Sequence, residues 1–254
     1  MLFDTHIHTT FSFDSRMTLE EAQSRAQARG MGLCITDHMD LNTKGQFFDP
    51  WTYQETYWPK RAKDLLIGTE CGMDPRYSVK SEEYLKITSL DFTLGSVHTI
   101  GDEDIYSRSI YEKYEREEFW HAYFKVVLEC LKTHPFIDSL SHLDYPARLL
   151  PYGEAGFNFR RHEKGILPIY EWLISHDLAL ELNLKRFAPE TRAEFKTHFS
   201  VYRELGGKYV TLGSDSHNVA AVGFGLREGY DLLEELDLTP VHFEHHEIVS
   251  DHLY

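Results

Sequence analysis

The chain has little cysteine, and none of it stands in a metal-binding or redox motif. The three cysteines, Cys34, Cys71 and Cys130, are far apart and form no CxxC pair, which argues against a disulfide framework and a zinc ribbon. No apolar run approaches membrane-spanning length, and residues 1–10 lack the basic segment and apolar run of a secretory signal. We therefore expect a cytoplasmic protein with no membrane partner.

Positive charge is also scarce. The sequence has 26 basic and 41 acidic residues, which gives a formal net charge of −15. Such a surface repels nucleic-acid phosphates, so we expect no nucleic-acid partner. No linker, repeat or low-complexity segment divides the chain, and 254 residues suit one α/β barrel, so we predict a single domain over residues 1–254.

What the sequence does contain is a recurring unit. Short apolar runs end in a polar residue and are separated by stretches long enough for a helix, a pattern typical of parallel β–α units. The predicted strands are Leu2–His8, Gly32–His38, Leu65–Cys71, Phe92–His98, Ile137–His142, Leu178–Asn183 and Tyr209–His217. We expect an α/β fold of about seven strands.

Helices are predicted between these runs. Thr18 and Glu21 form a capping box ahead of the helix Leu19–Arg29, and Gly30 stands where a C-terminal cap would lie. The other predicted helices are Tyr111–Lys132, Ile166–His176, Glu190–Leu205 and Ala220–Leu236.

Two stretches do not fit a regular barrel, Leu41–Lys63 with its many aromatic residues and Tyr145–Lys164 with its glycines and arginines. Both follow a predicted strand, the end at which barrel enzymes place active-site loops. They are candidate substrate walls. For the aromatic residues, simple packing over the barrel end is an equal alternative.

Metal-type side chains end six of the seven predicted strands. They are His6 and His8, His38, Glu70, His98, His142, and Asp215 with His217. The alternation of a strand puts His6 and His8 on one face, where both imidazoles can reach one ion. Asp14 follows in a turn-like segment that can fold over the same opening. Strand six, with Glu181 and Asn183, is the exception.

In a closed barrel these strand ends converge, and so many unpaired imidazoles and carboxylates would be costly to bury without metal ions. With Asp14 the set has nine groups, too many for one tetrahedral zinc ion, so we predict two or three divalent ions that share a bridging carboxylate. The nitrogen and oxygen ligands suit zinc, manganese or iron.

These motifs resemble the polymerase and histidinol phosphatase (PHP) family, and within it the histidinol phosphatase branch. The resemblance spans nearly the whole chain. It rests on Asp4–Thr9, Phe11–Asp14, Ile35–His38, Gly68–Glu70, Ser96–His98, His142–Asp144 and Ser214–His217. It implies a distorted (β/α)7 TIM-like barrel with a trinuclear site.

The resemblance also implies which residues hold each ion. In the PHP pattern, His6, His8, Glu70 and Asp215 would hold the first ion, Glu70, His98 and His142 the second, and Asp14, His38 and His217 the third.

We therefore predict a metal-dependent phosphomonoesterase, with L-histidinol phosphate as the expected substrate. The metal ions would neutralise the phosphate and activate water, and Asp215 or His217 would protonate the departing alkoxide. Alternatives are a nucleotide phosphatase or phosphodiesterase of the same family and a non-catalytic metal-binding module.

Candidate substrate contacts lie outside the ligand set. Arg160 and Arg161, in a predicted loop after strand five, could clamp phosphate, with Arg148 and Lys185 as further candidates. A carboxylate among residues 102–104 would suit the substrate ammonium. The run His242–His246 lies outside the strand pattern, and we interpret it as a solvated tail.

Overall fold

Buried apolar strands form the centre of the molecule. The computed structural model describes residues 1–43, 46–149 and 157–253. The seven predicted strands are all present: β1 Phe3–Ile7, β2 Gly32–Met39, β3 Leu65–Gly72, β4 Phe92–Ser96, β7 Ser139–Leu140, β8 Ala179–Asn183 and β9 Tyr209–Gly213. Nearly all of their residues are buried, as expected for parallel strands covered by helices.

The strands pair in the order β1-β2-β3-β4-β7-β8-β9-β10-β11, and every pair is parallel except the last. One edge of β9 pairs with β8, and the other edge is shared: β10 pairs with the first residues of β9, Tyr209 and Val210, while β1 approaches the segment after its end. There, within the described residues, a single parallel bridge joins Ile7 and Ser216. The fold is therefore mixed α/β with a mainly parallel sheet, and the pairing of the described residues shows no closed barrel.

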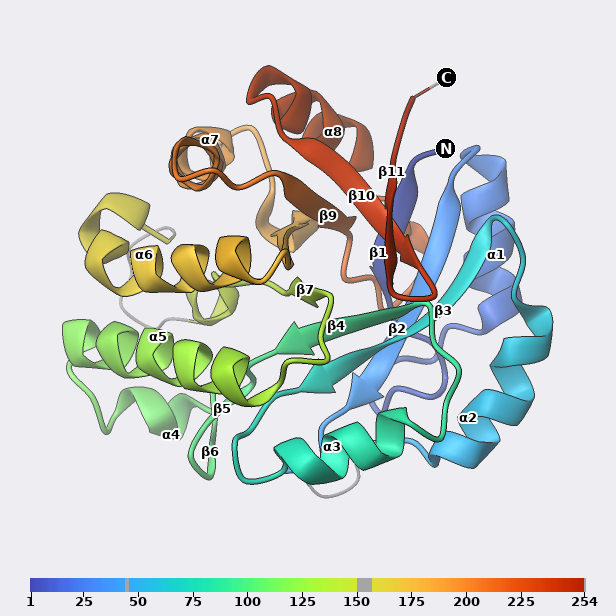
Figure 1. Cartoon of the computed structure of the whole chain (residues 1–254), viewed down its shortest axis with the longest axis horizontal. Coiled ribbons are helices and arrows are strands. Elements are labelled where there is room, and N and C mark those ends of the chain that lie inside the picture. Colours follow the sequence, from blue (N-terminus) through green and yellow to red (C-terminus); the bar gives the residue numbers. More distant parts are fainter. Residues whose placement is uncertain (44–45, 150–156, 254) are drawn as a thin grey trace.

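Helices surround the sheet (Figure 1). They are α1 Leu19–Ala28, α2 Pro50–Tyr57, α3 Ser78–Leu85, α4 Arg108–Tyr111, α5 Arg116–Thr133, α6 Phe159–Ser175, α7 Arg192–Glu204 and α8 Leu226–Glu235. The capping box of Thr18 and Glu21 is confirmed at the start of α1, and Gly30 follows the helix with a φ of 66°. No helix of the described part is long and apolar enough to cross a membrane.

The predicted helix boundaries shift where a local cap intervenes. Helix α6 begins at Phe159, seven residues before the predicted start, because the Asn158 side chain accepts a hydrogen bond from the Arg161 amide. Arg160 and Arg161 therefore lie on a helix, and the expectation of a loop there is wrong. Residues 150–156 of the predicted loop Tyr145–Lys164 lie outside the described residues.

The carboxyl-terminal run is not a solvated tail. Thr239–Glu244 forms β10 and Glu247–Ser250 forms the antiparallel β11. His245 and His246 both have positive φ, 52° and 65°, as the central residues of a tight hairpin turn do. Figure 1 shows this hairpin crossing the sheet, with both chain termini nearby. Val241, His242 and Phe243 are all buried, which the many histidines of the run obscured in the sequence.

The aromatic residues of Leu41–Lys63 mostly join the core. Phe48 stacks on Tyr53 with ring centroids 4.0 Å apart, and both are buried, as is Tyr57. Trp51 is 60% exposed. The packing alternative is thus confirmed for these three rings. A second hairpin, β5 Thr99–Ile100 and β6 Glu103–Asp104, follows β4 and borders the site.

Candidate metal centre

The carboxyl ends of the parallel strands bring the nine predicted ligands together. His6, His38 and Glu70 lie within β1, β2 and β3, and the others follow β1, β4, β7 and β9 within a few residues. These groups converge because parallel strands end at the same edge of the sheet. Asp14 approaches from the loop after β1, with a carboxylate oxygen 3.0 Å from His217 Nε2 and 3.7 Å from His38 Nε2.

Glu70 lies at the centre of the cluster. Its Oε2 atom is 3.4 Å from His6 Nε2, 3.5 Å from His8 Nε2 and 3.0 Å from His38 Nδ1. Its Oε1 atom is 3.2 Å from His98 Nε2 and 2.9 Å from His142 Nε2. One carboxylate thus faces five imidazoles, which is the arrangement expected of a bridging metal ligand.

The side chains fall into overlapping groups with ligand atoms within 4.8 Å of one another. The groups are His6, His8 and Asp215; His6, Glu70 and His142; His38, Glu70 and His98; and His8, His38 and His217. Each is large enough to hold an ion, and the sharing of residues among them suits more than one ion.

Unsatisfied atoms provide an independent test of whether these residues fit metal ions. Within the described residues, His6 Nε2, His8 Nε2 and Glu70 Oε2 are buried and have no hydrogen-bond partner. Burying such groups without a partner is costly, and a cation would compensate all three at once. The donor set, imidazole nitrogens and carboxylate oxygens, is one that divalent transition metals bind.

The outer nitrogens of the histidines are held in place. Nδ1 of His6 lies 2.6 Å from Glu181, that of His8 lies 3.0 Å from Ser12 Oγ, and that of His98 lies 2.8 Å from Asp40. For these three rings, Nε2 therefore points into the cluster. Such outer contacts fix ring orientation and tautomer in metal sites.

Electrostatics keep the central carboxylates ionised. Burial disfavours charge on Glu70, but His6, His38 and His98 hold the pKa of its carboxyl well below the usual value. Burial likewise opposes charge on Asp215, but Arg148 and His6 hold the pKa of its carboxyl well below normal. Burial lowers the pKa of His8 and of His142, so both imidazoles are neutral and able to ligate near pH 7.

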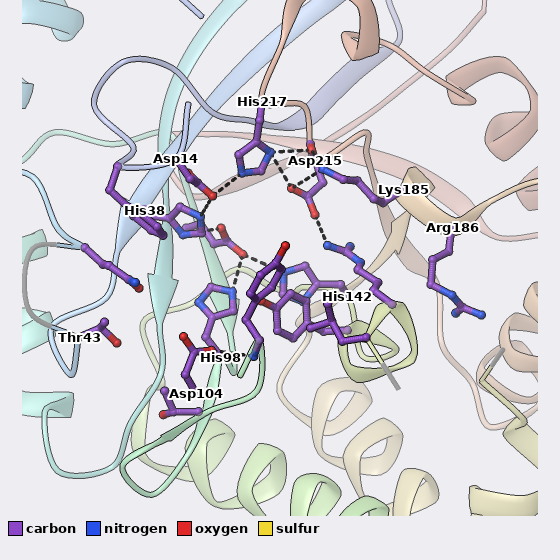
Figure 2. Close-up of a pocket in the computed structure, with 18 residues that line it drawn as sticks. Asp14, His38, Thr43, His98, Asp104, His142, Lys185, Arg186, Asp215 and His217 are labelled. Atoms are coloured by element: carbon purple, nitrogen blue, oxygen red, sulfur yellow. Dashed lines mark hydrogen bonds and ion pairs between the residues drawn. The ribbon is translucent and has the colours of Figure 1, made fainter. Parts of the chain in front are cut away.

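The cluster forms the floor of a pocket of about 790 Å³. Seven of the nine predicted ligands line it, and His6 and His8 lie buried beneath. Figure 2 shows Asp215 and Lys185 on one side, with Thr43 and Asp104 across the pocket. Asp215 has a φ of 53°, an uncommon backbone conformation for a non-glycine residue and one that concentrates at functional sites.

Two of the four predicted substrate contacts line the pocket. Arg148, in the 3-10 turn Tyr145–Arg148, donates to Asp215 Oδ2 at 2.6 Å and to Asn183 Oδ1 at 2.7 Å. Lys185 donates to the Asp215 carbonyl at 2.8 Å. Both cations are therefore held beside a predicted ligand.

Arg160 and Arg161 are not among the described residues that line this pocket. Arg160 lies 3.6 Å from Glu163 of its own helix, and Arg161 lies 2.6 Å from Glu117 of α5. Their position in α6 directs them to the outer surface, so it gives no support to the predicted phosphate clamp.

Sequence reasoning missed two buried carboxylates, Asp40 and Glu181. The signal for Asp40 was its spacing, two residues after His38 and hence on the same face of the extended chain. Glu181 lies on β8, the strand for which no metal ligand is predicted from the sequence. It contacts His6 Nδ1 and also accepts a hydrogen bond from the His142 amide at 2.7 Å.

The family profile described as PHP domain matches residues 4–185, more than half of the chain. This chain belongs to the PHP domain family. All nine predicted ligands except Asp215 and His217 fall within the matched residues of the PHP domain.

Several relatives of this PHP domain protein have names that state an activity. The chain is 34% identical to the "Probable histidinol-phosphatase" of Clostridium acetobutylicum, over 96% of this chain and 97% of that one. It is 32% identical to the "Histidinol-phosphatase" of Lactococcus lactis, over 84% and 83%. The crystal structure of the Lactococcus lactis histidinol phosphate phosphatase, a complex with zinc, L-histidinol and phosphate, superposes with a TM-score of 0.87 at 28% identity and covers 98% of both chains.

Proposed function

We propose that this protein is a metal-dependent phosphomonoesterase that hydrolyses L-histidinol phosphate to L-histidinol and phosphate. The convergence of nine ligand groups around Glu70, beneath a pocket that also holds Arg148 and Lys185, carries the proposal. Two relatives with more than 30% identity are named "Probable histidinol-phosphatase" and "Histidinol-phosphatase", and the similar crystal structure holds zinc with the expected products. The formal net charge of −15 disfavours a polynucleotide partner.

We propose three divalent ions, zinc, manganese or iron. His6, His8, Glu70 and Asp215 would hold the first ion, Glu70, His98 and His142 the second, and Asp14, His38 and His217 the third. Of the four overlapping groups of ligand atoms, one consists of His6, His8 and Asp215, which belong to one proposed ion. Each of the other three combines ligands of two proposed ions, as neighbouring ions with a bridging carboxylate would require. Together the ions would neutralise phosphate charge and lower the pKa of a water molecule toward neutrality.

The chain's own residues would orient the ester and move the proton. Arg148, held by Asp215 and Asn183, presents a planar guanidinium suited to two phosphate oxygens, and Lys185 adds a second positive charge. The depressed pKa of Asp215 keeps its carboxylate ionised, the form that could take a proton from a water molecule whose own pKa the ions would lower. Asp215, or His217, whose Nδ1 atom lies 3.4 Å from Asp215 Oδ1, would then protonate the leaving alkoxide.

The ammonium of the substrate would bind Asp104. Of the three neighbouring carboxylates, Asp102 pairs with Arg76 and Glu103 pairs with Lys113, whereas Asp104 lines the pocket. It lies across the pocket from Lys185, so one molecule can span both charges (Figure 2). We expect Asp104→Asn to raise KM for L-histidinol phosphate about tenfold while leaving hydrolysis of an ester without an ammonium unchanged. Equal losses for both esters would contradict this role.

Three broader predictions accompany the proposed activity. We propose that β1–β4 and β7–β9 make up the distorted (β/α)7 barrel, because the bridge between Ile7 and Ser216 brings its first and last strands together. A large apolar cluster with residues from Leu2 to Leu238, and a smaller one with residues from Phe3 to Phe243, each draw on the whole length of the chain and support a single domain over residues 1–254. A biosynthetic phosphatase would act in the cytoplasm.

The decisive experiment measures phosphate release by protein loaded with manganese, zinc or iron. L-histidinol phosphate is compared with p-nitrophenyl phosphate, a nucleoside monophosphate and a phosphodiester, and metal content is measured in the same samples. We expect L-histidinol phosphate to give the highest kcat/KM, and chelator-treated protein to regain activity when the metal is returned. Metal-loaded protein that hydrolyses none of these esters would overturn the proposal. Faster cleavage of the diester would point to a phosphodiesterase.

A further inference from the structure

Asp40 is a buried carboxylate that contacts two predicted metal ligands without being one. It follows β2, and its side chain is 1% exposed. Its Oδ1 atom lies 2.8 Å from His98 Nδ1, and its Oδ2 atom lies 3.1 Å from His38 Nδ1. These two histidines belong to different proposed ions, the second and the third, so one carboxylate contacts a proposed ligand of each. The His38 Nδ1 atom that it approaches also lies 3.0 Å from Glu70 Oε2.

The chain leaves space for this carboxylate at Gly72. A Cβ atom at Gly72 would lie 1.8 Å from Asp40 Oδ1 and 2.5 Å from its Cγ. No side chain fits there while Asp40 keeps its position, since real Cβ atoms do not approach other atoms so closely. The end of β3 therefore has glycine where the Asp40 carboxylate must pass to reach His98.

Glu181 has the same arrangement at the other side of the cluster. Its side chain is fully buried, and its Oε1 atom lies 2.6 Å from His6 Nδ1. Its Oε2 atom accepts hydrogen bonds from the His142 amide and from Asn183 Nδ2. A Cβ atom at Gly213 would lie 2.2 Å from Glu181 Oε1, so a glycine again makes room for a carboxylate behind a histidine.

We propose that Asp40 and Glu181 are positioning residues of the metal centre, Asp40 for the second and third ions and Glu181 for the first, with Gly72 and Gly213 providing the space they occupy. An imidazole that donates its Nδ1 proton to a carboxylate presents Nε2 as a more basic ligand in a fixed orientation. His6 and His98 have this geometry, with Nε2 facing Glu70. The inference rests on the proposed trinuclear site.

Metal stoichiometry and affinity test the two carboxylates separately from catalysis. Wild-type protein, Asp40→Asn, Glu181→Gln and Gly72→Ala are equilibrated with buffered free Mn²⁺ over a concentration series, and bound metal per chain is measured. We expect Asp40→Asn to weaken two of three bound ions by roughly ten- to a hundredfold, and Glu181→Gln to weaken mainly one. Gly72→Ala should reproduce Asp40→Asn, because it displaces the same carboxylate without removing it.

Asp251→Asn is the matched control. Asp251 is buried and contacts His242 Nδ1 at 2.6 Å, the same distance as Glu181 to His6, but it lies at the opposite end of the sheet beside Phe3. We expect it to bind metal as the wild type does. Wild-type affinity for all ions in folded Asp40→Asn or in folded Gly72→Ala would overturn the inference for Asp40, and the same result in Glu181→Gln would overturn it for Glu181. Wild-type protein that binds no Mn²⁺, Zn²⁺ or Fe²⁺ would instead refute the proposed function.

Discussion

Each end of the sheet has a buried histidine paired with a carboxylate, but the two histidines differ in the surroundings of their second nitrogen. At the carboxyl end, His6 contacts Glu181 at 2.6 Å, and its other nitrogen has no hydrogen-bond partner within the described residues. At the amino end, His242 contacts Asp251 at 2.6 Å, and its other nitrogen lies 3.6 Å from Glu244. Histidine and carboxylate content alone therefore does not distinguish a metal site from a structural cluster.

What distinguishes the ends is whether the charges are already compensated. Near the amino ends of the strands, Asp91 is paired with Arg61 at 2.8 Å, and Asp138 is paired with His246 at 2.9 Å. At the other end, Glu70 faces five imidazoles and still has an oxygen without a hydrogen bond. Convergent, unsatisfied ligand atoms identify the functional end.

Glu70→Gln should have the largest effect, because it removes the one carboxylate that faces both proposed Glu70-bound ions. We expect kcat/KM for L-histidinol phosphate to fall roughly a thousandfold or more, with loss of bound metal. Steady-state kinetics and metal analysis of the purified variant measure both.

The control for this change is Asp91→Asn at the amino end, which also removes a buried carboxylate charge. It should reduce thermal stability while leaving metal content unchanged. Comparable metal loss in the two variants would remove the distinction between the ends of the sheet.

Arg148→Lys should have the next largest effect. A lysine keeps the charge but loses the planar fork that can bond two phosphate oxygens, so we expect kcat/KM to fall roughly ten- to a hundredfold with metal content retained. Arg160→Lys is the matched control, because Arg160 lies on α6 outside the lining of the pocket. A larger loss of kcat/KM in Arg160→Lys than in Arg148→Lys would instead support Arg160 as a phosphate contact.

The convergence of the predicted ligands could be predicted from the sequence because eight of the nine end an apolar run; Asp14 lies in the loop after the first run. A run that must be buried fixes the direction of its strand, and parallel strands place their last residues at one edge. His98 and His142, far apart in sequence, meet at Glu70 for this reason. The same logic could have found Asp40, which follows His38 at a spacing of two.

The contacts at the amino end of the sheet could not be predicted from the sequence in this way. The carboxylates that pair with the hairpin, Asp91, Asp138 and Asp251, precede or follow strands at positions with no shared motif. Their contacts with His242 and His246 depend on where a late hairpin docks, which is a tertiary event. Likewise, the Asn158 cap moved the start of α6 ahead of Arg160, a boundary that apolar periodicity does not define.

Phe243→Ala tests whether the hairpin acts in stability alone. Phe243 is buried and stacks on Phe92 with centroids 5.3 Å apart, so we expect the free energy of unfolding to fall by about 3 kcal/mol. Urea unfolding at a fixed excess of metal measures the change. Metal content and kcat/KM should stay at wild-type values. A variant that lost metal without losing stability would show that the hairpin belongs to the functional end.

His246→Asn should have the smallest effect on the free energy of unfolding, and the size of this effect should depend on pH. The hydrogen bond with Asp138 raises the pKa of His246 above its usual value, with Asp91 adding to the shift. A raised pKa means that the charged form stabilises the folded state below the ordinary histidine pKa and that this contribution disappears as pH rises through the pKa of the folded state.

Asparagine is chosen for this variant because it tolerates the positive φ at this position. Since the His246 side chain is 47% exposed, we expect a loss of about 0.5 kcal/mol at pH 6 and none at pH 9, measured by urea unfolding. An equal loss at both pH values would mean that the ion pair contributes nothing and that the turn geometry accounts for the effect.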